Sequence, residues 1–178
     1  IGRAALKVLL DDQGDGLALV AVNDIADVDN LAYLLRYDTV YGRYHRKVEV
    51  EQDALVVDGT RIKAFREAEP DRLPWRDLGV DLVLECTGVF TRAEDMERHI
   101  RAGASHVILS APSKSEDVPT VVHGVNRPDG TPQLMSCASC TTNCITPVIE
   151  VARRRIGVER ATMTTVHAYT GGQQLVDG

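Results

Sequence analysis

The stretch LALVAVND, residues 17–24, decides the fold of this chain. Its first six residues form a continuous apolar run, which is typical of a strand buried on both faces of a parallel sheet. Asn23 and Asp24 follow directly, and polar loops after parallel strands are where such sheets meet their ligands. The stretch therefore predicts an α/β fold with a ligand site at the end of this strand.

Helices are expected before and after this strand. Residues 2–10 show helical periodicity. The apolar face expected for this helix consists of Ala4, Ala5, Val8 and Leu9. Asp27 is expected to cap a second helix, whose apolar residues are Leu31, Leu34 and Leu35. Thr91 and Glu94 have the spacing of a capping box, which predicts a third helix that ends near Gly103.

The segment between the second and third helices has a different pattern. Residues 47–65 predict short antiparallel strands, with a hairpin turn at Asp58–Gly59. The strands expected further along the chain are residues 80–85, 107–109, 121–122 and 134–135. Since strands and helices alternate over most of the chain, we expect an α/β fold of the Rossmann type, a doubly wound parallel sheet with right-handed crossovers.

Composition excludes several classes of protein. The 178 residues contain 20 Lys and Arg against 26 Asp and Glu, a formal net charge of −6, which argues against a nucleic-acid partner. No apolar run approaches the ~20 residues that span a bilayer, so no membrane association is expected. No secretory signal is visible, and the four cysteines are expected as reduced thiols in the cytoplasm. Because the chain begins at Ile1 without Met and stops at Gly178, we expect it to be a piece of a longer protein.

Gly2 and Asp24 fit part of a dinucleotide-binding fingerprint. That motif places glycines before a helix and an acidic residue about 20 residues further on. Asp24 follows Gly2 by 22 residues, where its carboxylate could accept hydrogen bonds from the hydroxyls of an adenosine ribose. It would also repel a 2′-phosphate, which favours NAD over NADP. A turn glycine and a loop carboxylate with no ligand explain the two residues equally well.

A second candidate site surrounds Cys140. The segment SCASCTTNC, residues 136–144, collects hydroxyls and thiols directly before a helical run over residues 145–156. A helix that begins near Cys140 would direct backbone N–H groups and the positive end of its dipole at the sulfur. That arrangement lowers the pKa of a thiol and favours the reactive thiolate.

His167 is the expected partner of Cys140. Residues 158–167 are expected to form a strand that ends at His167. A helix over residues 141–155 spans ~21 Å, and a strand of this length spans ~30 Å. If the strand runs back along the helix, the histidine returns to the helix start, where it would activate the thiol as a nucleophile.

Other interpretations of these residues stay open. A buried cysteine is most often a small packing residue, and a histidine at a strand end is more often structural than catalytic. Cys137, Cys140 and Cys144 form a C-x₂-C-x₃-C pattern that could ligate zinc or an iron–sulfur cluster. We expect no metal site, because a fourth ligand is missing nearby and Cys86 lies at a distant strand end.

The segment ASCTTNC, residues 138–144, closely resembles the active-site signature of the phosphorylating glyceraldehyde-3-phosphate dehydrogenase family. Further matches occur in the same order along the chain. They are IGR at 1–3, ND at 23–24, YDTVYG at 37–42, ECTG at 85–88, SAP at 110–112, GVN at 124–126 and TTVH at 164–167. Since a chain of this family is roughly twice as long, the sequence resembles its N-terminal half.

The resemblance implies a domain organisation. Residues 1–139 would form an NAD-binding Rossmann domain that lacks the first strand and the first two glycines of the fingerprint. Residues 140–178 would begin an α+β catalytic domain. We expect the 178 residues expressed alone to be unstable and inactive, and the complete protein to be a cytoplasmic homotetramer.

The resemblance also implies the reaction, which is the NAD-dependent oxidative phosphorylation of glyceraldehyde 3-phosphate to 1,3-bisphosphoglycerate in glycolysis. Cys140 matches the nucleophile that forms a thiohemiacetal and then a thioester, and His167 matches the base. The residues that match phosphate sites are Ser139, Thr141 and Thr170. The residues that match the NAD site are Gly2, Arg3, Asp24, Arg66, Thr87, Gly88 and Ser110. Alternatives are an erythrose-4-phosphate dehydrogenase or a non-enzymatic cofactor- or metal-binding module.

Two departures from the family pattern bear on the site. Cys137 stands where the family usually has Asn, and it adds a second thiol near the nucleophile that could make the site sensitive to oxidation. The sequence GGQQ at 171–174 replaces an Asn-Asp-Gln type of sequence, which puts the substrate preference in question but not the type of reaction.

Overall fold

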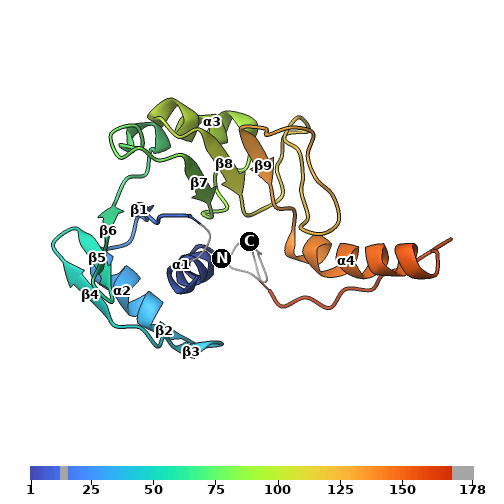
Figure 1. The fold of residues 1–178 in the computed structure, drawn as a ribbon, viewed down its shortest axis with the longest axis horizontal. Helices are drawn as coiled ribbons and strands as arrows, with labels where there is room; N and C mark the ends of the chain where they lie inside the picture. Colours follow the sequence, from blue (N-terminus) through green and yellow to red (C-terminus); the bar gives the residue numbers. More distant parts are fainter. Residues whose placement is uncertain (13–15, 170–178) are drawn as a thin grey trace, which may run out of the picture.

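The computed structural model describes residues 1–12 and 16–169. Its helices are α1 (Gly2–Asp11), α2 (Val28–Arg36), α3 (Ala93–Ala102), α4 (Cys140–Arg155) and the short 3₁₀ helix η1 (Pro70–Arg72). Its strands are β1 (Ala21–Asn23), β2 (Tyr37–Asp38), β3 (Gly42–Arg43), β4 (Val48–Glu51), β5 (Ala54–Val57), β6 (Thr60–Phe65), β7 (Leu82–Glu85), β8 (His106–Leu109) and β9 (Leu134–Ser136). Figure 1 shows two layers connected at one side, with α4 projecting from the body.

One layer is a four-stranded sheet in the order β1-β6-β5-β4. β1 pairs in parallel with β6, whereas β4, β5 and β6 are antiparallel, as predicted. Asp58 and Gly59 have φ angles of 47° and 85°, so both residues adopt the positive φ that tight hairpin turns require. Helices α1 and α2 pack their buried leucines against this sheet.

The other layer is a three-stranded parallel sheet in the order β7-β8-β9. Helix α3 packs on it around Met96 and Val107, which are both fully buried. α3 ends at Gly103, whose φ of 118° is left-handed, and a Cβ at this position would lie 2.6 Å from the backbone nitrogen of Arg76. Gly103 therefore ends the helix and allows a close approach of two chain segments.

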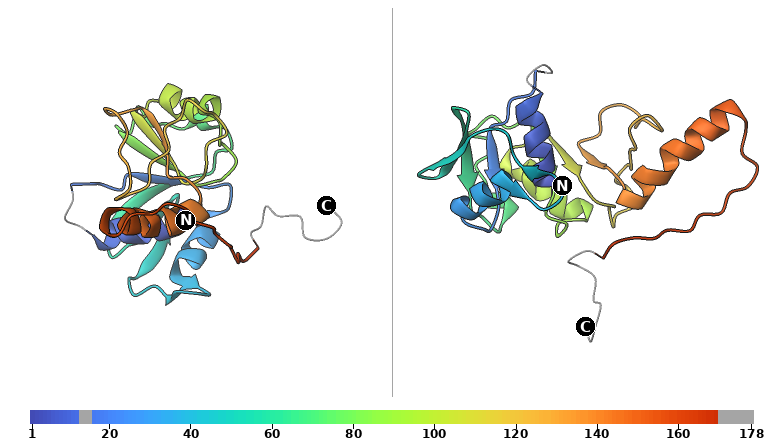
Figure 2. Two further views of the ribbon diagram at one scale, coloured as in Figure 1. Left: turned by 90° about the vertical axis from the view of Figure 1, so that its right-hand side faces the viewer. Right: turned by 90° about the horizontal axis from the view of Figure 1, so that it is seen from below.

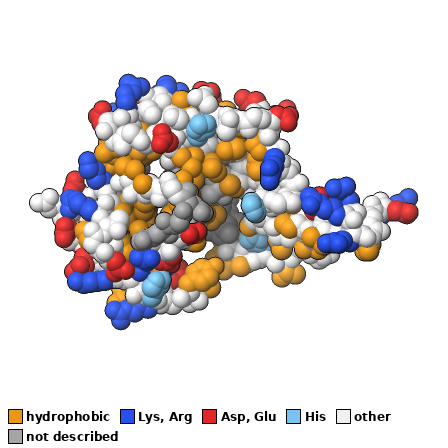
Figure 3. Space-filling model, in the orientation of Figure 1, with side chains coloured by type: hydrophobic (Ala, Val, Ile, Leu, Met, Phe, Trp, Pro, Cys, Tyr) orange, Lys and Arg blue, Asp and Glu red, His pale blue; other side chains and the backbone are white. Residues whose placement is uncertain are grey.

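The parallel strand pairs and the helices confirm an α/β fold of the Rossmann type. In the described residues, however, the strands form two main sheets and the small antiparallel pair β2-β3 instead of one continuous sheet. Among the described residues, the second edges of β1 and β7 have no partner strand. A cavity of about 850 Å³ lies between these two edges. Figure 3 shows hydrophobic side chains bordering the hollow between the layers.

Three predictions about helix faces and caps were wrong. α1 buries Leu6 and Leu10, one turn apart, and leaves Val8 62% exposed, because its packing against the sheet selects a different face. Asp27 lies at the N-cap position of α2 but makes no capping bond, since its carboxylate pairs with a guanidinium. Thr91 does not cap α3. Instead, the Ser115 hydroxyl accepts from the first N–H of that helix.

Three of the predicted strands also need correction. β1 is confined to Ala21–Asn23, although the apolar run begins at residue 17. Residues 121–122 form no strand, and only a single parallel bridge between Thr120 and Ser136 forms near them. Residues 158–167 run back from the end of α4 without strand pairing, because no described strand lies beside them to share hydrogen bonds (Figure 2).

Helix α4 is loosely packed. None of its residues is buried, and Val148 and Val151 are each more than 60% exposed, one turn apart. No described helix is both long enough and apolar enough to cross a membrane.

Candidate active site

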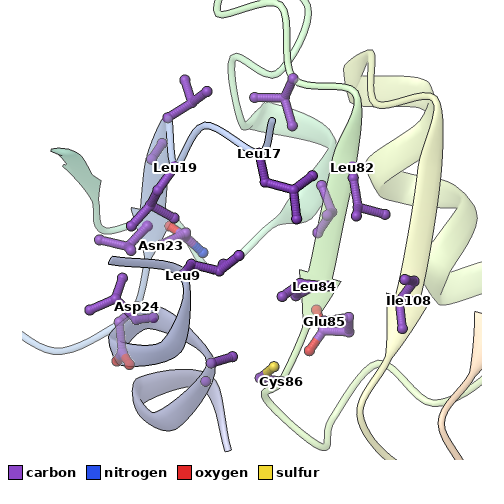
Figure 4. Close-up of a pocket in the computed structure, with 18 of the residues that line it drawn as sticks. Leu9, Leu17, Leu19, Asn23, Asp24, Leu82, Leu84, Glu85, Cys86 and Ile108 are labelled. Carbon is purple, nitrogen blue, oxygen red and sulfur yellow. The ribbon is translucent and has the colours of Figure 1, made fainter. Parts of the chain in front are cut away.

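The carboxyl ends of β1 and β7 face each other across the start of α1. Figure 4 shows Asp24 after β1 and Glu85 and Cys86 at the end of β7, all at the same end of the cavity. A Cβ on Gly2 would lie only 3.2 Å from the Cβ of Cys86. Gly2 therefore allows a close approach of helix and strand, the role of the last glycine in a dinucleotide fingerprint.

Asp24 lies where a ribose-binding carboxylate is expected. One of its oxygens, Oδ1, accepts a hydrogen bond of 2.9 Å from the backbone N–H of Ala26. The neighbouring Asn23 accepts from the N–H of Glu67 and donates to the carbonyl of the same residue. These bonds connect the loop after β1 to the loop after β6, so the sheet positions the Asp24 carboxylate.

Two cationic residues predicted at the cofactor site make contacts within the protein. Arg66 donates to the carbonyl of Ile25 at 2.8 Å and to the carboxylate of Asp27 at 2.6 Å. Arg3 donates to the carbonyl of Leu34 on α2 at 3.1 Å. Arg66 thus supports the loop that carries Asp24, and Arg3 joins the first turn of α1 to α2.

The loops after β7 and β8 carry the other predicted cofactor residues. Thr87 donates both its backbone N–H and its hydroxyl to Glu85 Oε1, at 2.6 and 2.5 Å. Gly88 follows with a φ of 73°. Ser110 donates its backbone N–H to the Glu85 carbonyl at 2.9 Å, which joins the two loops. Since these strands are parallel, Thr87, Gly88 and Ser110 lie at the same sheet edge.

Cys140 is the first residue of α4, directly after β9. Its Sγ lies 3.0 Å from Nε2 of His167, although the two residues are 27 positions apart. The predicted pair therefore meets, and it does so because the chain returns along α4 from Gly157, as Figure 2 shows. A thiol and an imidazole at this distance can exchange a proton.

The surroundings of Cys140 favour its thiolate. The hydrogen bond with His167 is the largest influence, and it lowers the pKa of the Cys140 thiol below its ordinary value, with help from the N–H and hydroxyl of Thr141. The same contact raises the pKa of the His167 imidazole, together with a hydrogen bond to the Ala168 carbonyl. Both shifts favour the charged forms, the thiolate of Cys140 and the imidazolium of His167.

Cys137 has the opposite tendency. Desolvation of its sulfur raises the pKa of the Cys137 thiol, and the neighbouring Cys86 thiol raises it further. Cys137 is therefore a weaker nucleophile than Cys140 at a given pH. No group of three or more Cys, His, Asp or Glu side chains that could hold a metal ion occurs within residues 1–12 and 16–169.

The turn before Cys140 contains backbone strain. Ala138 is 4% exposed and has a φ of 63°, a left-handed conformation that costs a residue other than glycine ~1 kcal/mol or more. The side-chain amide of Asn143 donates to the carbonyls on both sides, those of Cys137 at 2.6 Å and Ser139 at 2.9 Å. Asn143 thereby holds the turn that presents the Cys140 thiol.

Ser136 supports the same turn from the buried side. It is fully buried, donates its hydroxyl to the Ala111 carbonyl at 2.8 Å and accepts from the N–H of Ala138 at 3.1 Å. No role was predicted from the sequence for Ser136 or Asn143. Their position beside the nucleophile, in a segment rich in hydroxyls and amides, was the available signal.

The predicted phosphate-binding residues differ in what the structure shows. Ser139 is the N-cap of α4, where its Oγ accepts from the N–H of Thr142 at 3.0 Å and lies 2.8 Å from the hydroxyl of that residue. Thr141 is half-buried beside Cys140, at the start of the helix. Thr170 and residues 171–174 lie outside the described residues.

Comparisons with known proteins agree with this geometry. Residues 1–93 match the family "Glyceraldehyde 3-phosphate dehydrogenase, NAD binding domain", and residues 139–178 match "Glyceraldehyde 3-phosphate dehydrogenase, C-terminal domain". The first of these families binds NAD, and its match covers the α1 start and the loops with Asp24, Arg66 and Thr87.

Curated relatives carry the same name. The chain is 48% identical to the glyceraldehyde-3-phosphate dehydrogenase of Clostridium acetobutylicum, over 100% of this chain and 53% of that protein. It is 45% identical to that of Thermotoga maritima and 44% identical to that of Geobacillus stearothermophilus, in each case over 99% of this chain and 54% or 53% of the relative. The chain thus spans about half the length of these relatives. On this evidence, it belongs to the glyceraldehyde-3-phosphate dehydrogenase family.

Proposed function

We propose that the complete protein containing this chain is an NAD-dependent, phosphorylating glyceraldehyde-3-phosphate dehydrogenase of glycolysis. The contact of 3.0 Å between Cys140 Sγ and His167 Nε2 is the observation that carries the proposal. Residues 1–139 are the NAD-binding unit and residues 140–178 begin the catalytic unit. Family membership supports a cytoplasmic homotetramer that uses glyceraldehyde 3-phosphate and inorganic phosphate.

The residues at the sheet edge fit NAD. The Asp24 carboxylate can accept hydrogen bonds from the adenosine ribose, and the close packing of Gly2 on Cys86 brings the start of α1 to the strand end, where its N–H groups favour a pyrophosphate. Thr87, Gly88 and Ser110 line the same edge. When bound, NAD supplies the acceptor for a hydride.

Cys140 carries the substrate through the reaction. Its thiolate adds to the aldehyde carbon, the new C–S bond forms as the C=O π bond breaks, and the His167 imidazolium donates its proton to the oxygen, which gives a thiohemiacetal and a neutral imidazole. His167 removes the hydroxyl proton as the carbon loses its hydride, and a thioester remains on Cys140. Inorganic phosphate then attacks the thioester carbon, the C–S bond breaks, and the acyl phosphate leaves while the thiolate is regenerated.

Hydroxyls near the nucleophile support the binding of phosphate. Thr141 lies in the first turn of α4, where its hydroxyl and the helix N–H groups can donate to an anion. Ser139 caps the same helix, and its hydroxyl can still donate to an anion while its oxygen accepts from Thr142. We propose that Ser139 and Thr141 form one phosphate site and that Thr170 belongs to the other.

The test uses thiol variants of the full-length protein. Cys140→Ser should abolish NADH formation from glyceraldehyde 3-phosphate, NAD and phosphate, because a serine hydroxyl cannot form the thioester. Cys137→Ser is the matched control, since it removes a thiol three positions away and should retain most of the activity. Full activity in Cys140→Ser would contradict the mechanism, and a higher kcat/KM with erythrose 4-phosphate would identify the longer aldehyde as the substrate.

A further inference from the structure

A buried series of hydrogen-bonded side chains connects the core to the loop after β7. Trp75 Nε1 donates to His99 Nδ1 at 3.1 Å, His99 Nε2 lies 3.1 Å from Glu85 Oε2, and Glu85 Oε1 accepts both donors of Thr87. The side chains of His99 and Glu85 are 5% and 4% exposed. The mechanism above uses none of Trp75, His99 and Glu85, although Thr87 lies at the proposed NAD site.

The indole of Trp75, the donor at the start of this hydrogen-bonded series, determines the tautomer of His99. An indole can only donate, so His99 Nδ1 must accept and carries no proton. The ring proton is then on Nε2, which donates to Glu85. The indole therefore ensures that the imidazole presents a donor to the carboxylate.

Glu85 in turn accepts on both oxygens. Burial alone would raise the pKa of the Glu85 carboxyl, but hydrogen bonds from His99 and Thr87 outweigh it and hold the pKa below its ordinary value. The carboxylate keeps the N–H and the hydroxyl of Thr87 directed inward, and the Thr87 hydroxyl accepts from the N–H of Val89. The turn over residues 86–89 is thus organised around a buried anion.

We propose that Glu85 is a positioning residue for the cofactor, and that the Trp75–His99 pair locks it in place by fixing the histidine tautomer. The proposal rests on the proposed function, because it assigns the 86–89 turn to the NAD site. Through Thr87, Glu85 sets the backbone of the turn at Gly88, opposite the Asp24 loop and beside the start of α1. A cofactor in this cleft would therefore contact the 86–89 turn, whose shape depends on the Glu85 carboxylate, although the cofactor itself does not contact Glu85.

Because the His99 tautomer is fixed, Glu85→Gln should disrupt the hydrogen bonds around position 85 although the two side chains are nearly isosteric. If the amide oxygen faces Thr87, the amide nitrogen meets the N–H of His99, and two donors oppose each other. If the amide is reversed, it meets the backbone N–H of Thr87 instead. Trp75→Phe removes the indole donor, so that His99 can take its other tautomer and accept from the amide of Gln at position 85.

The experiment measures NAD affinity and steady-state kinetics in the full-length protein. Glu85→Gln should raise the Kd and KM for NAD by roughly tenfold, as expected when a buried donor loses its acceptor, with a smaller change in kcat. The alkylation rate of Cys140 should not change. Glu85→Gln/Trp75→Phe should recover a substantial part of the lost affinity, although Trp75→Phe alone does not improve it. Glu94→Gln is the matched control, an exposed glutamate in the first turn of α3.

The outcomes separate this inference from the proposed function. If the parent protein shows no saturable NAD binding, the proposed function is wrong. If the parent binds NAD and Glu85→Gln melts at a lower temperature with unchanged Kd and KM for NAD, Glu85 is only structural and the inference is overturned. If the double variant is as impaired as the product of the two single variants, the tautomer lock is overturned.

Discussion

Cys140 Sγ and His167 Nε2 lie 3.0 Å apart at the first residue of α4, although 27 positions separate the two residues in the chain. The contact lowers the pKa of the thiol and raises that of the imidazole, so each residue stabilises the charged form of the other. Both side chains are exposed to solvent, which leaves the sulfur accessible to a substrate. The structure thus brings together the two residues proposed as nucleophile and base.

We expect the His167→Asn variant to move the pH profile of Cys140 alkylation to higher pH. The alkylation rate rises as the pH passes through the thiol pKa, and the hydrogen bond from His167 lowers that pKa. Without it, a smaller thiolate fraction remains at neutral pH and the midpoint rises toward the ordinary value for cysteine. Peptide-resolved mass spectrometry after timed iodoacetamide treatment measures the profile. An unchanged midpoint would show that the pair does not activate the thiol.

Asn143→Ala should loosen the turn that presents Cys140. The substitution removes two hydrogen bonds to carbonyls on either side of Ala138, each with a net contribution of ~1 kcal/mol. We expect a lower melting temperature and a decrease in kcat larger than any change in the KM for NAD. Ala138→Gly is the matched control, because glycine accepts the left-handed φ without strain. A normal kcat in Asn143→Ala would remove its role in the site.

Asp24→Ala should weaken NAD binding and reduce the discrimination against NADP. In the proposed site the Asp24 carboxylate accepts from the ribose hydroxyls and repels a 2′-phosphate, so we expect its loss to act in opposite directions on the affinities for NAD and NADP. We expect the KM for NAD to rise roughly tenfold and the NAD-to-NADP ratio of kcat/KM to fall. Asp29→Ala, on the neighbouring helix, serves as the control. If the ratio did not change, Asp24 would have no role in cofactor choice.

The 178 residues expressed alone should lack a cooperative melt and stoichiometric NAD binding. An apolar cavity of about 850 Å³ separates the edges of β1 and β7, and α4 buries none of its residues. Both features leave apolar surface in contact with water, so the chain lacks part of the apolar burial that is the main driving force for folding. Calorimetry and an NAD titration check the prediction. A single sharp transition with one NAD bound per chain would contradict it.

Local patterns predicted most of the elements correctly. The antiparallel strands β4–β6 follow from alternating apolar residues around Asp58–Gly59, and the end of α3 follows from Gly103. The boundaries and faces were less predictable. Leu17 belongs to an apolar run but is 64% exposed outside β1, because a strand needs a hydrogen-bonding neighbour as well as apolar side chains.

The candidate site divides in the same way. Cys140 and His167 could be identified from their residue types and spacing. The lengths of the helix and of the segment that returns along it can be calculated from the number of residues, and they allow the two side chains to meet. Asn143 and Ser136 could not be identified in this way, since a supporting amide or hydroxyl has no distinctive sequence pattern. The roles proposed for Arg3 and Arg66 stay predictions, although both guanidiniums bond to carbonyls of the protein itself.

The amino-acid sequence alone determined the α/β class and the family resemblance, because these depend on periodicity and on contiguous motifs. It offered the pairing of Cys140 with His167 only as one interpretation among several. Only the tertiary structure decided that β1 and β7 lie in separate sheets, that Ala138 is strained, and that Glu85 and His99 meet in the core. In the sequence, nothing distinguishes Glu85 and His99 from other polar residues. Their contact at 3.1 Å arises because α3 packs on the sheet β7-β8-β9, and packing between distant segments is not encoded in any local pattern.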